Sequence, residues 1–221
     1  MLSTGETLSL QTLDDVIGGR VWEAASTLCR WLESEQSALR NTNVLELGSG
    51  TGVCGLYAAS LGCRSVVLTD GGPPVVLELL EGNIMRNRLR VTKAAGGPVE
   101  IRSKELRWGK EVEEEAMKGI RWVIGSDLTY DDDLHEALCT TLHRLLTIAP
   151  DARIVLCEEH GAPSASAIDS EGLYADEAFE AFARVATSKG LRASMLPAGA
   201  AAWPMRDFER AAPFVFEVSL A

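Results

Sequence analysis

The stretch from Asn43 to Gly55, with the sequence NVLELGSGTGVCG, constrains the fold of this chain more than any other feature. Its first half is an apolar run that contains a single acid, Glu46, and such a run is typical of a short buried strand. The glycines that follow allow the backbone to turn sharply and to approach a ligand where any Cβ atom would collide. Glu46 would lie at the carboxyl end of the strand, the edge at which open α/β sheets bind ligands. The stretch therefore predicts a nucleotide-cofactor site.

Two classes of cofactor use a glycine-rich loop of this kind. The segment GTGVCG satisfies the GxGxxG pattern of dinucleotide-binding folds, but in those folds the first glycine follows the strand directly, whereas two residues intervene here. Glu46 would repel a pyrophosphate and attract the sulfonium and α-ammonium groups of S-adenosylmethionine. Asp70, at the end of the next apolar run, is placed to hydrogen-bond ribose hydroxyls in either class. We therefore favour S-adenosylmethionine over NAD.

The composition is that of an ordinary compact protein. A chain of 221 residues with 46% hydrophobic content is long enough for a three-layer core, so we expect one domain over 1–221, in which 1–40 contribute a helix to the cofactor pocket. The five cysteines are scattered and form no CxxC pair, which favours reduced thiols over disulfides or a zinc site.

The first residues resemble no secretion or import signal, and no apolar run is long enough to span a bilayer, so we expect a cytoplasmic protein with no membrane partner. A formal net charge of -11 disfavours nucleic acid as a partner. We further expect a monomer.

Strand-like and helix-like segments alternate along the chain without an internal repeat. This alternation predicts an α/β fold with a doubly wound, mostly parallel seven-stranded sheet and helices on both faces. The expected strands are 44–47, 65–69, 99–102, 122–125, 153–157, 191–196 and 214–218. The expected helices begin near 21, with Val21 on the buried face of the first, and then cover 53–60, 75–86, 132–146 and 176–189. Segments 161–172 and 197–213 do not fit the pattern and are either substrate loops or simple connections.

Six motifs follow one another in a fixed order. They are VWEAASTLCRWL, VLELGSGTGVCGLYAASLGC, VVLTDG, EGNIMRN, LRWG and GSDLTY. Together they resemble the successive motifs of the seven-strand protein-lysine methyltransferases of methyltransferase family 16. The similarity covers 21–146 well and the C-terminal third only loosely. It implies a Rossmann-like class I methyltransferase fold, S-adenosylmethionine as cofactor, and a protein that carries a lysine as the partner.

The resemblance also implies roles for individual residues. Trp22 would lie against the cofactor, residues 48–50 would wrap its methionine part, and Asp70 would hold the ribose. Trp108 would flank the adenine, and Ser126 would line the pocket after the fourth strand. The complete set of expected cofactor-binding residues is Trp22, Glu46, Gly48, Ser49, Gly50, Gly52, Asp70, Trp108 and Ser126.

The segment DLTY, from Asp127 to Tyr130, resembles the DxxY motif of these enzymes. Methyl transfer to an amine moves positive charge onto nitrogen, so catalysis consists mostly of alignment and of removal of the amine's proton and water. A carboxylate at Asp127 would orient the amine and stabilise the developing cation, and Tyr130 would offer its ring face or hydroxyl. In the alternative, Asp127 caps the helix expected from 132 and Tyr130 packs in the core. The motif lacks the prolines of the NPPY type, which argues against nucleobase and glutamine-amide acceptors.

Two acidic clusters leave alternatives open. The aspartates at 131–133 either begin a helix, where carboxylates suit the dipole, or guide a basic substrate. Glu158, Glu159 and His160 follow the fifth strand and either contact the substrate or bind a metal. Three adjacent side chains at a strand end cannot all converge on one ion, so we expect no metal.

Other features are less specific. Trp31 is expected in the core of the first helix, and Trp203 is either a loop anchor or a wall of the acceptor site. Arginine, histidine or a small molecule remains as an alternative acceptor. A catalytically idle binding module with the same fold is the alternative from another functional class.

Overall fold

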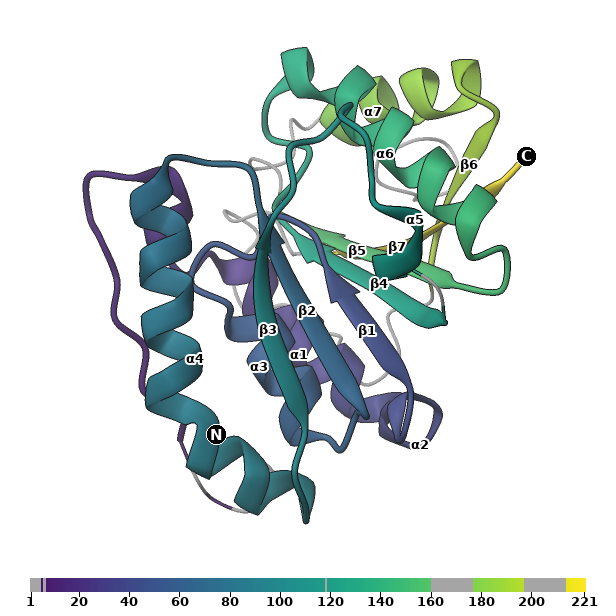
Figure 1. The fold of residues 1–221 in the computed structure, drawn as a ribbon. Coiled ribbons are helices and arrows are strands. Elements are labelled where there is room, and N and C mark those ends of the chain that lie inside the picture. Colours follow the sequence, from purple (N-terminus) through teal and green to yellow (C-terminus); the bar gives the residue numbers. More distant parts are fainter. Residues whose placement is uncertain (1–4, 6, 118, 160–176, 197–213) are drawn as a thin grey trace, which may run out of the picture.

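The computed structural model contains a seven-stranded sheet with the strand order β3-β2-β1-β4-β5-β7-β6 (Figure 1). It describes residue 5 and residues 7–117, 119–159, 177–196 and 214–221. The strands are β1 (Asn43–Glu46), β2 (Ser65–Asp70), β3 (Glu100–Glu105), β4 (Ile120–Ser126), β5 (Arg153–Glu158), β6 (Leu191–Met195) and β7 (Phe214–Leu220). The first five pair in parallel, and β7 runs antiparallel to both β5 and β6. The sheet is therefore mostly parallel, with each strand close to its predicted position.

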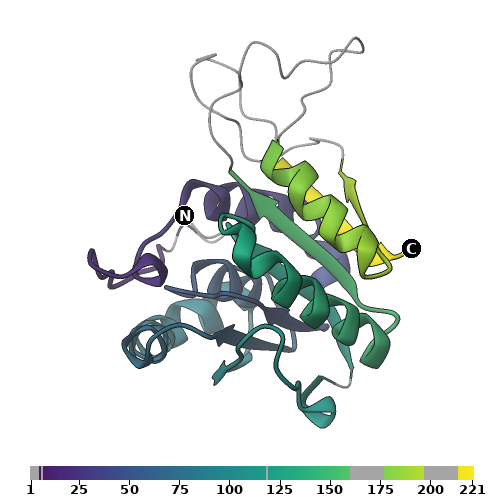
Figure 2. The same ribbon diagram turned by 90° about the horizontal axis from the view of Figure 1, so that it is seen from above.

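Helices cover both faces of the sheet. They are η1 (Ile17–Gly19), α1 (Glu23–Ser34), α2 (Gln36–Leu39), α3 (Val53–Ser60), α4 (Pro74–Ala95), α5 (Glu114–Met117), η2 (Asp132–Leu134), α6 (His135–Ile148) and α7 (Glu177–Ser188). The helices α1, α3 and α4 pack on one face, and α6 and α7 pack on the other (Figure 2). Among the described residues, no helix combines the length and the hydrophobicity needed to cross a membrane.

Three helix boundaries differ from those expected. The helix α1 begins only at Glu23 because Trp22 has an extended backbone, and Val21 is 42% exposed instead of buried. The helix α4 continues through an alanine pair, which favours helix, until Gly96 ends it with a φ of 77°. The segment expected as one helix from 132 starts with the 3-10 turn η2 before α6 begins.

Alternate residues of the central strands build two separate apolar cores. In β5, Val155 and Cys157 pack beneath α1, whereas Ile154 and Leu156 pack beneath α6 and α7. Strands buried on both faces require continuous apolar runs, which is why the sequence marks them clearly. The two acids Glu46 and Glu158 stand out against this pattern, because each ends such a strand and is buried.

Candidate active site

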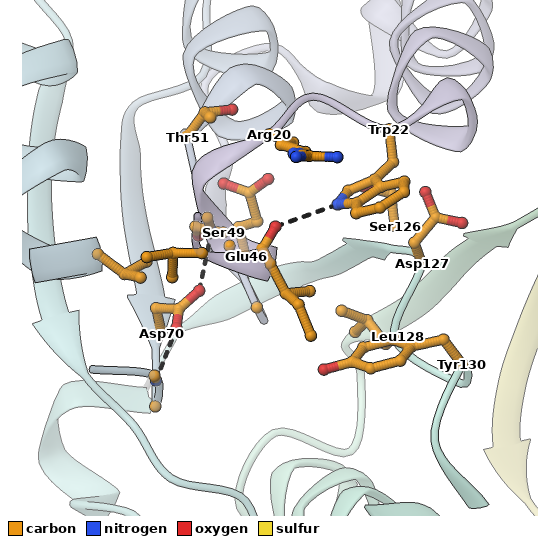
Figure 3. A pocket seen from close by; sticks show the side chains of 18 of the residues that line it. Arg20, Trp22, Glu46, Ser49, Thr51, Asp70, Ser126, Asp127, Leu128 and Tyr130 are labelled. Carbon is orange, nitrogen blue, oxygen red and sulfur yellow. Dashed lines mark hydrogen bonds between the residues drawn. The ribbon is translucent and has the colours of Figure 1, made fainter. Parts of the chain in front are cut away.

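A cavity of about 590 Å³ lies where β1, β2 and β4 end (Figure 3). Pockets for cofactor-sized ligands typically measure about 300–1,000 Å³. Its lining contains ten of the predicted site residues, which are Trp22, Glu46, Gly48, Ser49, Gly50, Asp70, Trp108, Ser126, Asp127 and Tyr130. Gly52 does not line it, since a Cβ atom there would lie 2.5 Å from Leu80 Cδ1, and this glycine instead permits close packing of α4.

The loop after β1 depends on two glycines with left-handed backbones. Gly48 has a φ of 56° and Gly50 a φ of 50°, a region that favours glycine. A Cβ atom on Gly48 would lie 2.6 Å from Leu128 Cδ2, and one on Gly50 would lie 2.7 Å from the carbonyl oxygen of Gly18. The glycine loop is therefore enclosed between the segment after β4 and the N-terminal segment, with no room for a side chain at Gly48 or Gly50.

Asp70, the last residue of β2, braces this loop. Its Oδ2 accepts a hydrogen bond from the backbone N–H of Gly50 at 2.8 Å, and its Oδ1 accepts one from the N–H of Gly72 at 2.8 Å. A carboxylate has about four acceptor positions, so capacity remains for the ribose hydroxyls that the sequence analysis assigned to it.

Two buried polar atoms beside the glycine loop have no hydrogen-bond partner within the described part of the chain. They are Glu46 Oε2 and Ser49 Oγ, and Glu46 is only 2% exposed. The Ser49 side chain and the Gly55 backbone adjoin the Glu46 carboxyl and partly offset the effect of its burial, but neither forms a hydrogen bond of good geometry with these two atoms. Burial raises the pKa of Glu46 to about 8, so its carboxyl is largely protonated near neutral pH in the ligand-free protein. Unsatisfied buried groups are costly, and a ligand with cationic donors would satisfy them. Together with the cradle free of Cβ atoms, they fit the methionine part of S-adenosylmethionine.

Asp127 follows β4 with a φ of 53°, an uncommon backbone for any residue except glycine. Its N–H donates to the carbonyl oxygen of Cys157 at 2.9 Å, and its Oδ1 accepts from the N–H of Glu159 at 3.1 Å. Its Oδ2 is buried and has no hydrogen-bond partner in the described region. Burial also raises the pKa of Asp127 to about 6. One oxygen thus anchors the side chain to the residue that follows β5, while the other has hydrogen-bonding capacity that the described residues do not use.

The interpretation of Asp127 as a helix cap is wrong. The turn η2 is capped by Asp131, whose Oδ1 accepts from the N–H of Asp133 at 3.0 Å, so the acidic run begins a helical segment as expected. Tyr130 is 54% exposed and lines the cavity instead of packing in the core. Figure 3 shows Tyr130, Trp22 and Asp127 on one side of the cavity and Asp70 on the other.

Glu158 has a role that the sequence analysis missed. It is fully buried, and its two oxygens accept hydrogen bonds from the N–H groups of Leu128 at 2.9 Å and Thr129 at 3.2 Å. Burial raises its pKa to about 8. His135 holds the same segment from α6, with its Nε2 2.9 Å from the carbonyl oxygen of Thr129. Glu158 therefore positions the backbone of the DLTY segment. The sequence signal that could have revealed this role is an acidic residue at the end of an apolar strand, which is also the signal that marks Glu46.

Of the other residues named in the sequence analysis, some have a described position in the structure and others lie outside the described residues. Trp31 lies in the core as predicted, 6% exposed and edge-on to Trp122 at a centroid distance of 6.1 Å. His160, Trp203 and the segments 161–172 and 197–213 lie outside the described residues. Among the described residues, no three His, Cys, Asp or Glu side chains are grouped to hold a metal ion.

The N-terminal segment contributes more of the cavity wall than Trp22 alone. Residues 15–18 and Arg20 also line the cavity. Arg20 donates through Nη2 to the carbonyl oxygen of Asp14 at 2.6 Å, and Trp22 donates through Nε1 to that of Ile17 at 3.3 Å. These bonds hold the segment in a compact turn beside the glycine loop. The turn is too short for hydrophobic periodicity to predict.

A family model described as lysine methyltransferase matches residues 4–167. The chain belongs to this family. It is 34% identical to protein-lysine N-methyltransferase EFM3 of Chaetomium thermophilum over 158 residues, which are 68% of this chain and 45% of that protein. It is 38% identical to protein N-lysine methyltransferase METTL21A of Xenopus tropicalis over 124 residues, which are 56% of this chain and 53% of that protein. The chain thus spans about half the length of these curated relatives.

A solved structure shares the fold of this lysine methyltransferase family member at low sequence identity. The methyltransferase domain of bacterial CtHen1 superposes with a TM-score of 0.57 at 13% identity, covering 90% of this chain and 100% of that one. The likeness agrees with the sheet order and with helices on both faces.

Proposed function

We propose that this protein transfers a methyl group from S-adenosylmethionine to a lysine side chain of a protein substrate. The observation that carries the proposal is that Asp127, whose buried Oδ2 has no hydrogen-bond partner among the described residues, lines the same cavity as Glu46 and the glycine loop. The names of the relatives, which are protein-lysine methyltransferases, agree with this chemistry.

The cavity offers a distinct group for each part of the cofactor. Glu46 and Ser49 would hold the charged amino-acid end, Asp70 would hold the ribose, and Trp108 would flank the adenine. When bound, the cofactor supplies a methyl group made electrophilic by the adjacent sulfonium. The position of Glu46 argues against NAD, because its carboxyl occupies the place where a pyrophosphate would require positive or N–H donor groups.

Asp127 and Tyr130 would act on the acceptor amine. With a pKa of about 6, Asp127 is mostly ionised at neutral pH, so its carboxylate can accept a hydrogen bond from the amine and stabilise the ammonium that forms. Lysine has a reference pKa of about 10.4, so the amine must first lose a proton, which passes to water. Tyr130 would present its ring or hydroxyl to the same nitrogen from the cavity mouth. These roles favour an enzyme over an idle binding module.

The partner is expected to be a protein with an accessible lysine. A net charge of -11 and the aspartates at 131–133 next to Tyr130 favour a basic acceptor region over nucleic acid. We also propose a cytoplasmic, monomeric enzyme that acts without a membrane.

The proposed acceptor can be tested by transfer of a labelled methyl group. The protein is incubated with a cell lysate and methyl-labelled cofactor, and the labelled products are hydrolysed and separated. We expect nuclease-resistant label in protein that is recovered as ε-methyllysine and is lost when the target lysine is replaced by arginine, because a guanidinium stays protonated. Label in methylarginine, methylhistidine, nucleic acid or small metabolites would contradict the lysine assignment but not methyl transfer itself.

A further inference from the structure

The N-terminal strap, defined here as residues 7–22, runs beside α4 and then reaches the glycine loop (Figure 1). Two asparagines of the EGNIMRN motif, Asn83 and Asn87, lie on α4 beneath it, and both are fully buried. Neither residue lines the cavity.

The two asparagine amides bind the strap as an adjacent strand would. The N–H of Ser9 donates to Asn87 Oδ1 at 2.8 Å, and Asn87 Nδ2 donates back to the carbonyl oxygen of Ser9 at 2.8 Å. Asn83 pairs in the same way with Gln11, at 2.7 and 3.0 Å. The spacing matches because four helical residues rise about 6 Å and two extended residues advance about 6.6 Å.

Asn83 makes two further contacts that Asn87 does not. Its Oδ1 also accepts from Arg86 Nη1, within α4, at 3.0 Å. Its Nδ2 also donates to the carbonyl oxygen of Thr51, in the glycine loop, at 3.0 Å. Asn87 instead donates to the carbonyl oxygen of Asn83, within α4, at 2.8 Å. The side-chain amide of Asn83 therefore hydrogen-bonds both to the strap, at Gln11, and to the glycine loop, at Thr51.

These two segments form facing walls of the cavity. The strap supplies Ile17, Gly18 and Trp22, and the loop supplies Ser49 and Gly50. The walls already touch, because a Cβ atom on Gly50 would lie 2.7 Å from the carbonyl oxygen of Gly18. Their relative position therefore determines the shape of the space between them.

We propose that Asn83 is a positioning residue for cofactor binding, which fixes the strap against the glycine loop and so preorganises the cavity. This inference rests on the proposed function, since it takes the cavity to be the cofactor site. Preorganisation lowers the cost of ordering the walls when a ligand binds, so the loss of Asn83 should appear in affinity.

The test compares Asn83→Ala with the matched control Asn87→Ala. Each variant removes one asparagine pair to the strap, but only the first removes the link to Thr51. We expect Asn83→Ala to weaken calorimetric binding of S-adenosylhomocysteine about ten-fold and to raise KM for S-adenosylmethionine while kcat stays within a few-fold. Asn87→Ala should change both constants less than about three-fold. Equal effects of the two variants would overturn the inference.

Hydrogen exchange in the ligand-free protein provides a readout independent of the cofactor. Asn83→Ala should accelerate amide exchange both in the strap and in residues 48–56, whereas Asn87→Ala should accelerate it in the strap alone. Unchanged exchange of residues 48–56 in Asn83→Ala would overturn the coupling. Wild-type protein that binds neither form of the cofactor would overturn the proposed function, and the exchange comparison would still decide whether Asn83 couples the two walls.

A second pair of variants covers the case in which Asn83→Ala does not fold. Gln11→Pro removes the N–H that donates to Asn83 Oδ1, and also the side-chain oxygen that accepts from Arg86 Nη2 at 3.1 Å, while the sequence of α4 stays unchanged. Ser9→Pro removes the corresponding N–H that donates to Asn87 Oδ1. We expect Gln11→Pro to lower cofactor affinity at least three-fold more than Ser9→Pro. Equal affinities would again contradict the role of Asn83.

Discussion

At the scale of single residues, Asp127 combines one carboxylate oxygen that accepts from the N–H of Glu159 with another that has no hydrogen-bond partner among the described residues. Asp127→Asn retains an oxygen that can accept from the N–H of Glu159, and asparagine tolerates the backbone φ of 53° better than most residues, so the fold should persist. We expect kcat to fall roughly 100-fold, in the range found for loss of a positioned acid–base group, with cofactor affinity within about three-fold. Steady-state kinetics and calorimetry measure the two effects separately.

The pH profile provides a second check on Asp127. Because its pKa is about 6 and the ionised form is the useful one, the kcat of the wild type should rise as pH increases through about 6. Asp127→Asn should lose the inflection near pH 6 and keep only the gradual rise caused by deprotonation of the acceptor amine. Tyr130→Phe, which removes only the hydroxyl, should retain the rise with a smaller loss of kcat. Wild-type rates in both variants would remove these residues from catalysis.

Glu46 links cofactor binding to proton release. Its pKa is about 8 in the ligand-free protein, and a bound cation favours the carboxylate and lowers that pKa, so binding near neutral pH should release a proton. Affinity should therefore increase from pH 6 to pH 7.5, by at most about ten-fold per pH unit. Calorimetry in buffers of different ionisation enthalpy measures the released proton, which Glu46→Gln should abolish. An affinity in the wild type that does not change with pH would contradict this coupling.

At the scale of elements, the end of β5 supports the segment after β4. Glu158→Gln keeps one acceptor oxygen but presents an NH₂ group to the other backbone N–H, which leaves a buried donor unsatisfied. We expect the free energy of unfolding to fall by about 1–3 kcal/mol and kcat to decrease with it. Glu136→Gln, which removes only an exposed ion pair between α6 and Lys189, is the control and should change the free energy of unfolding by less than about 1 kcal/mol. Denaturant unfolding measures the free energy of unfolding of both variants. Equal values for the two variants would show that Glu158 does not support the segment after β4.

Short-range patterns explain what the sequence predicted and what it did not. The strands were predictable because they are apolar runs bounded by turns, and the site was predictable because Glu46, Asp70 and Asp127 sit at or just after strand ends that meet at one edge. The strap was not predictable, because Gln11 and Asn83 are 72 residues apart in sequence. The spacing of the glycines does not reveal that Gly48 and Gly50 line the cavity whereas Gly52 faces Leu80.

At the scale of the whole molecule, the sheet brings together groups that are distant in sequence. The cavity collects residues from the N-terminal strap, the glycine loop, the end of β2 and the segment after β4. Family membership agrees with the proposed use of this arrangement for methyl transfer. The chain spans about half of its curated relatives, so its substrate protein must be identified by experiment on this chain.

The most direct test is a calorimetric titration of the full chain with S-adenosylmethionine and, separately, with NAD. We predict saturable binding of S-adenosylmethionine at one site per chain and no binding of NAD, because the buried Glu46 carboxyl can ionise beside a cation but offers a pyrophosphate neither a positive charge nor N–H donors. Saturable binding of NAD with no response to S-adenosylmethionine would contradict the assignment of the cavity.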